Sequence, residues 1–193
     1  MARALRIWLA CALLAAASGV LALLLGSSAL APGEVLRLLF LPDDSAASQV
    51  LHQLRLPRAW AAFGTGGLLA LAGALMQVLL RNPLAEPYVL GVSGGAAVGA
   101  LGAMVLGAAA AFVHAGAFGG ALLSIALVFA VARRDLGNAA VADGAEGTPR
   151  LLLAGVMLAA FWTALVTLML ALAPEARIRG MLFWLAGDLG ATD

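Results

Sequence analysis

The sequence contains no lysine, a single cysteine and few charges, and each shortage excludes a class of chemistry. All 11 basic residues are arginines, so the chain can form neither a Walker A phosphate loop nor a lysine Schiff base. With Cys11 alone, a disulfide within the chain and a cysteine zinc cluster are excluded. His52 and His114 each lack a second histidine at ligand spacing, so both are expected to be polar residues at a membrane surface. No metal or other cofactor is expected.

The scarcity of charge also indicates the environment of the protein. Charged residues make up 11% of the chain, against about 25% in soluble domains. Hydrophobic residues make up 64%, and 23 glycines add to them. So few charges cannot cover a water-facing surface, and a net charge of +1 gives no reason to expect a nucleic-acid partner. The composition predicts an all-α, polytopic membrane helical bundle in contact with the lipid bilayer.

Apolar runs predict about five transmembrane helices, because a bilayer core about 30 Å thick requires about 20 apolar residues as helix. They are expected at about residues 7–30, 59–80, 88–112, 116–132 and 151–173. The uncharged stretch from Tyr88 to Ala132 is too long for one span and is expected to turn near Val113–Gly116. Segments of about 33–57 and 176–187 are amphipathic and are predicted to lie along the membrane surface.

The first apolar run and the distribution of arginines indicate how the chain is oriented in the membrane. Ala29–Ala31 resembles a signal-peptide cleavage site, but the run is longer than a usual signal core and Pro32 argues against cleavage, so the span is expected to be retained. A cytoplasmic N-terminus agrees with a slight excess of arginines on the inner side. The inner set is Arg3, Arg6, Arg81, Arg133, Arg134 and Arg150, and the outer set is Arg37, Arg55, Arg58, Arg177 and Arg179.

Small residues recur at every fourth position of the third span, notably at Gly91, Gly95 and Gly99. On a helix they form a groove that lets another backbone approach closely, either inside one bundle or in a self-dimer. Acids and bases are missing from the middle of the spans, which argues against a proton-coupled carrier and an intramembrane protease. The polar residues there are mild, namely Thr65, Gln77, Ser93, Ser124, Thr163 and Thr167.

An ordered series of motifs closely resembles the permeases of ABC importers for iron chelates, haem and vitamin B12. The resemblance covers the whole chain and is most specific over residues 53–99. Its motifs are Gln53–Arg58, Gly66–Gln77, Arg81–Pro87, Leu90–Ala96, Leu152–Val156 and Phe183–Gly187.

The resemblance implies roles for several residues. Arg55 and Arg58 would dock a substrate-binding protein, a task suited to the planar guanidinium fork, although both could instead anchor the second span at the interface. The turn Asn82-Pro83-Leu84-Ala85 would form part of a cytoplasmic gate, or would simply break the helix. The fifth span around Gly155, Thr163 and Thr167 would line the translocation pathway.

The resemblance also implies partners, a location and a missing half. The family has ten spans, so the chain is expected to be the N-terminal half of a permease domain, either as a fragment or as a truncated product. The partners would be cytoplasmic ATPase subunits, a periplasmic or lipid-anchored binding protein and a second permease copy, in a bacterial inner membrane. Iron–siderophore is the first expected cargo, then haem, then cobalamin. A non-transporting scaffold and a small secondary carrier are the alternatives. Residues 1–193 alone are expected neither to transport nor to hydrolyse ATP.

Overall fold

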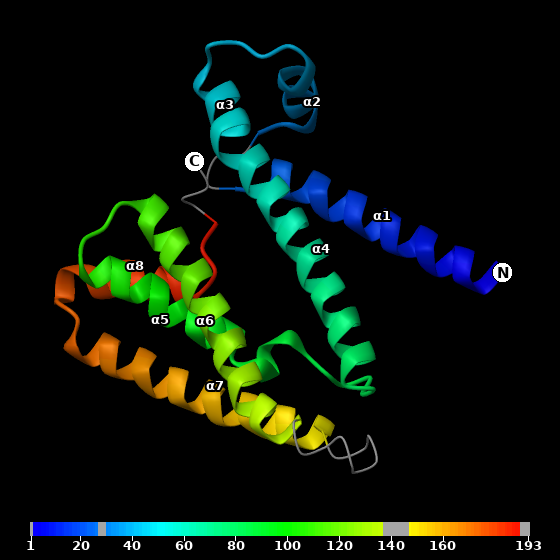
Figure 1. Cartoon of the computed structure of the whole chain (residues 1–193). Helices are drawn as coiled ribbons and strands as arrows, with labels where there is room; N and C mark the ends of the chain where they lie inside the picture. The colour runs from blue at the N-terminus through cyan, green and yellow to red at the C-terminus, as the bar shows by residue number, and fades with distance from the viewer. Residues whose placement is uncertain (1, 27–29, 137–146, 190–193) are drawn as a thin grey trace. The chain divides into compact units, whose positions relative to one another are not determined.

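The computed structural model of the chain consists of α-helices joined by turns (Figure 1). It describes residues 2–26, 30–136 and 147–189, without the side chains of residues 89, 132–136 and 147–151. The described residues contain no β-strand, which confirms the all-α class. Arg133, Arg134 and Arg150, which belong to the inner set of arginines, have side chains outside this description.

The chain divides into two compact units, Met1–Gly67 with Leu189–Asp193, and Leu68–Asp188. The first unit contains α1 (Ala2–Leu24), α2 (Pro32–Phe40), α3 (Ala46–Gln49), the π-helical turn η1 (Val50–Arg55) and the first half of α4 (Leu56–Leu79). The second unit contains the rest of α4, the 3-10 turn η2 (Pro87–Leu90), α5 (Val92–Val105), α6 (Ala110–Leu136), α7 (Gly147–Leu172) and α8 (Glu175–Leu185).

Within the described residues, four helical stretches are long and apolar enough to cross a membrane. They are Ala2–Leu24, Ala46–Leu79, Ala110–Val131 and Leu152–Leu172. The third expected span, 88–112, is shorter than predicted, because α5 has 14 residues and is therefore only about 21 Å long. A left-handed residue precedes it, Gly91 with φ 68°, and separates α5 from η2.

The turn between α5 and α6 lies earlier than the sequence predicts. It falls at residues 106–109, whereas Val113–Gly116, where the turn was expected, is part of α6. Gly107 takes the left-handed conformation with φ 72°. The N–H of Gly107 bonds to the carbonyl of Met104, and the N–H of Ala108 bonds to that of Ala103, both at 3.0 Å. This is the Schellman pattern that ends a helix at a glycine, and it places the turn.

The segment before α4 also differs from the prediction, because only its first part is a separate amphipathic helix. α2 buries Val35 and Leu38 against Leu51, but residues 46–55 continue directly into α4. The helix passes through Pro57 because the preceding turn is π-helical, with the N–H of Leu56 bonded to the carbonyl of Leu51. Such a wider turn accommodates a proline that would otherwise clash with the preceding turn of the helix.

In the second unit, α5 and α6 form the closest helix pair and run antiparallel (Figure 1). Gly95 faces Gly120, and one helical turn away Gly99 faces Gly116. α7 and α8 also pack against α5. The buried side chains of the pair include Ala100, Leu101 and Val128, so small residues allow the approach and larger ones fill the space beside it.

Candidate functional site

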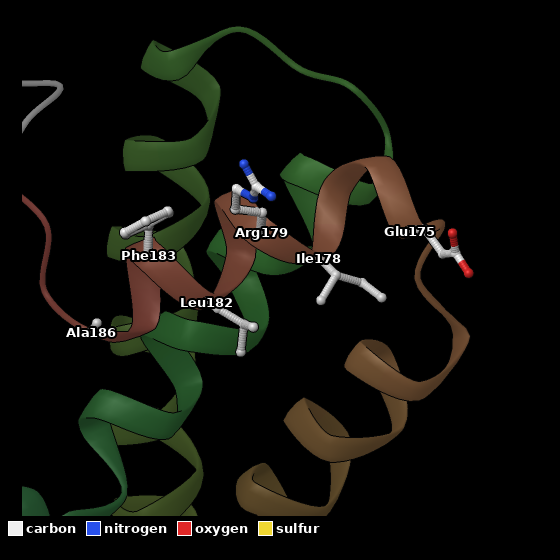
Figure 2. Close-up of a pocket in the computed structure, with 6 residues that line it drawn as sticks. All are labelled: Glu175, Ile178, Arg179, Leu182, Phe183 and Ala186. Carbon is white, nitrogen blue, oxygen red and sulfur yellow. The ribbon is translucent and has the colours of Figure 1, made fainter.

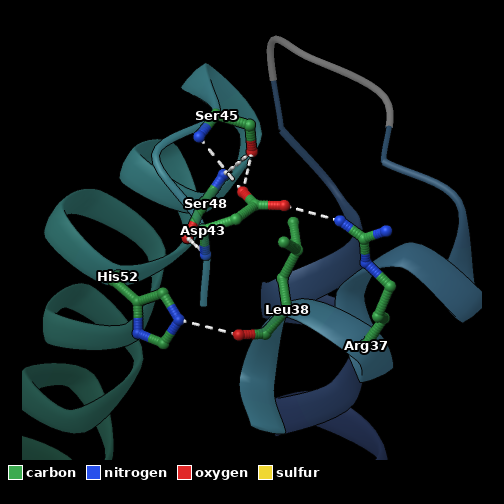
Figure 3. Close-up of polar contacts among 6 residues, drawn as sticks. All are labelled: Arg37, Leu38, Asp43, Ser45, Ser48 and His52. Carbon is green, nitrogen blue, oxygen red and sulfur yellow. Dashed lines mark hydrogen bonds and ion pairs between the residues drawn. The ribbon is translucent and has the colours of Figure 1, made fainter. Parts of the chain in front are cut away.

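A polar network in the first unit joins α2 to α3 and η1 (Figure 3). Asp43 accepts hydrogen bonds from the hydroxyl and the backbone N–H of Ser45, and it forms an ion pair of 2.5 Å with Arg37. The bonds from Ser45, followed by the charge of Arg37, hold the pKa of Asp43 below its ordinary value. His52 Nε2 donates to the carbonyl of Leu38 at 3.0 Å and joins η1 to α2.

The structure separates the two arginines that the resemblance treats as a pair. Arg55 is only 8% exposed, and its Nη1 donates to the carbonyls of Leu23 and Leu24 at 2.6 and 3.2 Å. Arg58 is exposed and makes no hydrogen bond or ion pair with any residue that the structure describes. Of these two arginines, only Arg58 is exposed.

The expected gate turn is an ordered turn at the end of α4. Arg81 takes a left-handed conformation with φ 48°, which is uncommon outside glycine. The side-chain oxygen of Asn82 accepts from the N–H of Leu84 at 2.9 Å, and the N–H of Ala85 donates to the carbonyl of Asn82 at 3.1 Å. With Pro83 in second position, these bonds define a tight turn that buries Ala85 and leaves Leu84 84% exposed.

The second unit contains a buried polar cluster whose members, Gly91, Ser124 and Trp162, lie far apart in the sequence. The Nε1 of Trp162 donates to Ser124 Oγ at 3.0 Å, and this hydroxyl donates to the carbonyl of Gly91 at 2.9 Å. Trp162 is 5% exposed and Ser124 is fully buried. A Cβ on Gly91 would lie 3.0 Å from the backbone nitrogen of Ala159, so glycine lets the turn before α5 approach α7. The signal in the sequence was a tryptophan in mid-span, because its N–H needs an acceptor there.

The predicted packing glycines have two different roles. A Cβ on Gly95 would meet the carbonyl of Gly120, and one on Gly99 would meet that of Gly116, so these two glycines pack inside the bundle. Gly91 lies just before α5. It takes the left-handed conformation there, and its carbonyl accepts the hydrogen bond from Ser124. By contrast, a Cβ on Gly66 in α4 would meet nothing within 4 Å, so this glycine is not needed for packing among the described residues.

The expected pathway residues on α7 lie in unlike environments. Gly155 is buried, whereas Thr163 and Thr167 are exposed. The hydroxyl of Thr163 donates to the carbonyl of Ala159 at 2.8 Å, and that of Thr167 to the carbonyl of Thr163 at 2.9 Å. Both hydroxyls are thus satisfied within the helix, so the exposed face offers only weak polar contacts.

α8 combines a buried anchor with an exposed apolar side. Met181 is fully buried, and Arg177 reaches from the start of α8 to the carbonyls of Met104 and Val105 at the end of α5. The other side of α8 lines an open hollow of about 580 Å³ (Figure 2). Its lining residues are Glu175, Ile178, Arg179, Leu182, Phe183 and Ala186. This helix overlaps the predicted segment 176–187, whose place along the membrane surface stays a prediction.

Residues able to hold a metal ion do not gather in the described ranges. Among them, no group of three or more His, Cys, Asp or Glu side chains lies close enough together to form a site. The described residues offer close helix packing, exposed apolar faces and an exposed arginine, Arg58.

Comparison with known sequences identifies the family. The profile of the FecCD transport family matches residues 13–193. The vitamin B12 import system permease protein BtuC of Salmonella paratyphi A is 37% identical over 194 residues, which cover 99% of this chain and 54% of the relative. The BtuC protein of Salmonella typhi is 36% identical over the same shares. The chain thus spans about half the length of the curated relatives it matches.

A solved structure agrees with this family. A chain assigned to the metal-chelate type of ABC transporter, in an inward-facing conformation, matches with a TM-score of 0.68 at 27% sequence identity. The match covers 93% of this chain and 50% of that one. The profile match, the identity to curated permeases and the likeness in structure all agree, and the chain belongs to the FecCD transport family.

Proposed function

We propose that this chain forms half of the membrane permease subunit of a bacterial ABC importer for a metal chelate. The observation that carries the proposal is the family match over residues 13–193. The match includes the second half of α1 and all of α2 to α8. In this proposal the exposed face of α7 with Thr163 and Thr167 lines the pathway. Its hydroxyls are already bonded within the helix, so a bulky chelate would meet a surface without strong ligands and could move on.

For the cargo, we propose cobalamin first. The curated relatives at 36–37% identity from Salmonella are named vitamin B12 import permeases. The sequence-based order, with iron–siderophore before haem and cobalamin, therefore has no support in these names. Siderophore and haem become the competing cargoes in the experiment below.

The proposed partners are ATPase subunits, a substrate-binding protein and a second permease copy. Without a lysine in its 193 residues, it cannot form a Walker A loop, so separate cytoplasmic ATPase subunits would supply the energy. A substrate-binding protein would dock on the outer side through the exposed Arg58, and a second permease copy would complete the transporter. The turn Asn82–Ala85 would belong to the cytoplasmic gate, with Leu84 as its exposed residue.

The proposed orientation has the N-terminus in the cytoplasm. It places Arg37, Arg55 and Arg177 on the outer side, where they would weaken the usual excess of positive charge inside. Each of them has a partner in the structure, Asp43 for Arg37 and helix-terminal carbonyls for the other two. Fixed structural roles account for these outer arginines and support the N-in orientation.

The test is uptake by the full-length permease in proteoliposomes with its ATPase and binding protein. We expect ATP-dependent uptake of labelled cobalamin that exceeds uptake of a ferric siderophore and of haem. Residues 1–193 alone, reconstituted with the same partners, serve as the control and are expected to give no uptake. Absence of ATP-dependent uptake of all three chelates by the full-length protein would contradict the proposed function.

A further inference from the structure

The segment that joins α4 to α5 packs against α6 and α7. It contains the turn Asn82–Ala85 and the 3-10 turn η2, and η2 contacts both of these helices. Within the described chain, α4 itself buries none of its residues from Leu56 to Leu79, whereas Leu90 and Gly91 at the end of the segment are buried. The position of the segment therefore depends on α6 and α7 more than on the helix that precedes it.

Two glycines allow the start of α5 to lie directly against α7. A Cβ on Gly91 would lie 3.0 Å from the backbone nitrogen of Ala159 and 3.3 Å from Cδ1 of Trp162. A Cβ on Gly94 would lie 2.6 Å from the Cβ of Trp162. Gly91 also has a φ of 68°, which residues with a side chain rarely adopt. The sequence thus keeps both positions free of side chains where α7 approaches.

One chain of buried hydrogen bonds fixes this contact. Nε1 of Trp162 donates to Ser124 Oγ at 3.0 Å, and this hydroxyl donates to the carbonyl of Gly91 at 2.9 Å. An indole N–H can only donate, so the hydroxyl must accept from it and has its single proton left for the carbonyl. The direction of each bond is therefore determined. Loss of the indole N–H would free Ser124 to turn toward another acceptor, such as the carbonyl of Leu90 at 3.4 Å.

This contact is connected with the turn Asn82–Ala85 through η2. Pro87 begins η2, and the N–H of Gly91 bonds to the carbonyl of Tyr88 at 2.9 Å. The turn itself is closed by two bonds of Asn82 to backbone N–H groups. Short elements with internal bonds leave little slack between the turn and Gly91. A shift of the Gly91 carbonyl would therefore displace the turn.

The same turn of α7 also carries Thr163. This residue is exposed, and its hydroxyl donates to the carbonyl of Ala159 at 2.8 Å. The backbone of Ala159 is thus beside Gly91 and bonded to Thr163. The helix break at Gly91 consequently lies one turn of α7 away from a residue proposed to line the pathway.

We propose that Trp162 is a positioning residue that holds the carbonyl of Gly91 through Ser124 and thereby sets the position of the turn Asn82–Ala85 relative to α7. This placement does not depend on any transport activity. Its consequence for transport rests on the function proposed above. In a cytoplasmic gate built on this turn, a firmly held Gly91 keeps the pathway closed while ATP is absent.

The first arm of the test measures hydrogen–deuterium exchange in the full-length protein in lipid nanodiscs. Trp162→Phe keeps an aromatic ring but loses the N–H, and Ser124→Ala loses the hydroxyl. In both variants we expect residues 88–95 to exchange roughly tenfold faster, because the bonds that hold the Gly91 carbonyl are lost. The double variant should exchange no faster than the single ones, since each change breaks the same chain of bonds. Trp60→Phe, at a tryptophan that is 72% exposed, is the control and should leave exchange unchanged.

The second arm measures ATP-independent efflux of labelled cobalamin from proteoliposomes that contain the full-length permease, its ATPase and its binding protein. Per amount of folded protein, Trp162→Phe and Ser124→Ala should each raise this efflux roughly threefold or more above that of Trp60→Phe, because the displaced turn no longer closes the pathway. A role in stability alone would lower ATP-dependent uptake without raising this efflux.

The outcomes separate the placement from the proposed function. Unchanged exchange at residues 88–95 in both single variants, or efflux no higher than in Trp60→Phe, would overturn the proposal. If Trp162→Phe does not fold, Ser124→Ala decides, because it removes one oxygen atom only. Absence of ATP-dependent uptake by the unaltered protein would refute the proposed function and the barrier role with it, while the exchange arm would still decide the placement by Trp162.

Discussion

In the first unit the fully or nearly buried apolar side chains are Val35, Leu38 and Leu51, and α1 buries none of its residues among those described. Hydrogen bonds and one ion pair near helix ends connect its elements. In the second unit, glycines bring the backbones of α5 and α6 into contact over successive turns. In the first unit α1 is fastened at its end by polar groups, whereas in the second unit the α5–α6 pair is closed along its length by packing.

The difference between polar fastening of α1 and close packing of α5 with α6 has a physical reason. Within a bilayer, apolar side chains gain little from leaving lipid, so close packing and satisfied polar groups hold helices together. The long helices α1 and α4 have mostly exposed surfaces, and the polar contacts that fasten α1 lie at its C-terminal end. The pair α5–α6 has small residues along one face and needs few polar contacts.

The largest effect is expected from a single methyl group in the α5–α6 contact. Gly120→Ala would drive a Cβ into the carbonyl of Gly95, and because backbone cannot move aside cheaply, we expect a loss of at least about 2–3 kcal/mol in stability. Gly119→Ala, at the adjacent position on the same helix, meets nothing within 4 Å and is the matched control. Thermal unfolding in detergent measures both. Equal stability of the two variants would show that α6 does not press its Gly120 face against α5.

A smaller effect is expected from the buried polar cluster. Ser124→Ala leaves the N–H of Trp162 without its acceptor, at a cost of about 1–3 kcal/mol. Adding Trp162→Phe removes the unsatisfied donor, so the double variant should be less destabilised than the sum of the single variants. Strict additivity in the thermal unfolding of the three variants would mean that the two side chains do not interact.

Much of the fold could be predicted from the sequence, because long apolar runs and helix-breaking prolines act locally. The apolar runs overlap α1, α4, α6 and α7, and the polar stretch with two prolines contains the turn at Asn82–Ala85. The predicted turn before α6 was wrong, since no charged residue interrupts 102–117 and the sequence does not show which of its glycines takes the left-handed conformation that ends α5.

The candidate site was less predictable, because its contacts join residues far apart in the chain. The cap on α1 connects Arg55 with Leu23 over 32 positions, and Trp162 reaches Ser124 over 38. The family motif predicts a functional role for Arg55. Only the arrangement of the helices shows that its side chain is buried against the end of α1. The same holds for Pro57, which the π-helical turn retains inside a helix.

The smallest effect is expected at Asp43, and it depends on pH. The pKa of Asp43 in the folded protein is lowered by the bonds from Ser45 and by Arg37, so its stabilising contribution is present above the ordinary carboxyl pKa of about 4. That contribution is lost as the pH falls through the lowered value. We expect protection of the Ser45 amide, corrected for intrinsic exchange, to fall in this acidic range.

Two neighbouring variants calibrate this prediction. Asp43→Asn should remove the acid-dependent part of the protection, whereas Asp44→Asn should retain it. A pH dependence that persists in Asp43→Asn would assign the effect to another group.

The most direct test of the two modes of stabilisation is one exchange experiment on the full-length protein in nanodiscs, comparing Gly120→Ala with Asp43→Asn. We predict that Gly120→Ala accelerates exchange in α5 and in residues 110–124 of α6 and leaves α2 and residues 46–53 unchanged. Asp43→Asn should accelerate exchange at residues 43–49 and leave α5 and α6 unchanged. If Gly120→Ala leaves α5 and α6 as protected as in the unaltered protein, or if both variants accelerate the same segments, the contrast between a packed unit and a polar-fastened one is wrong.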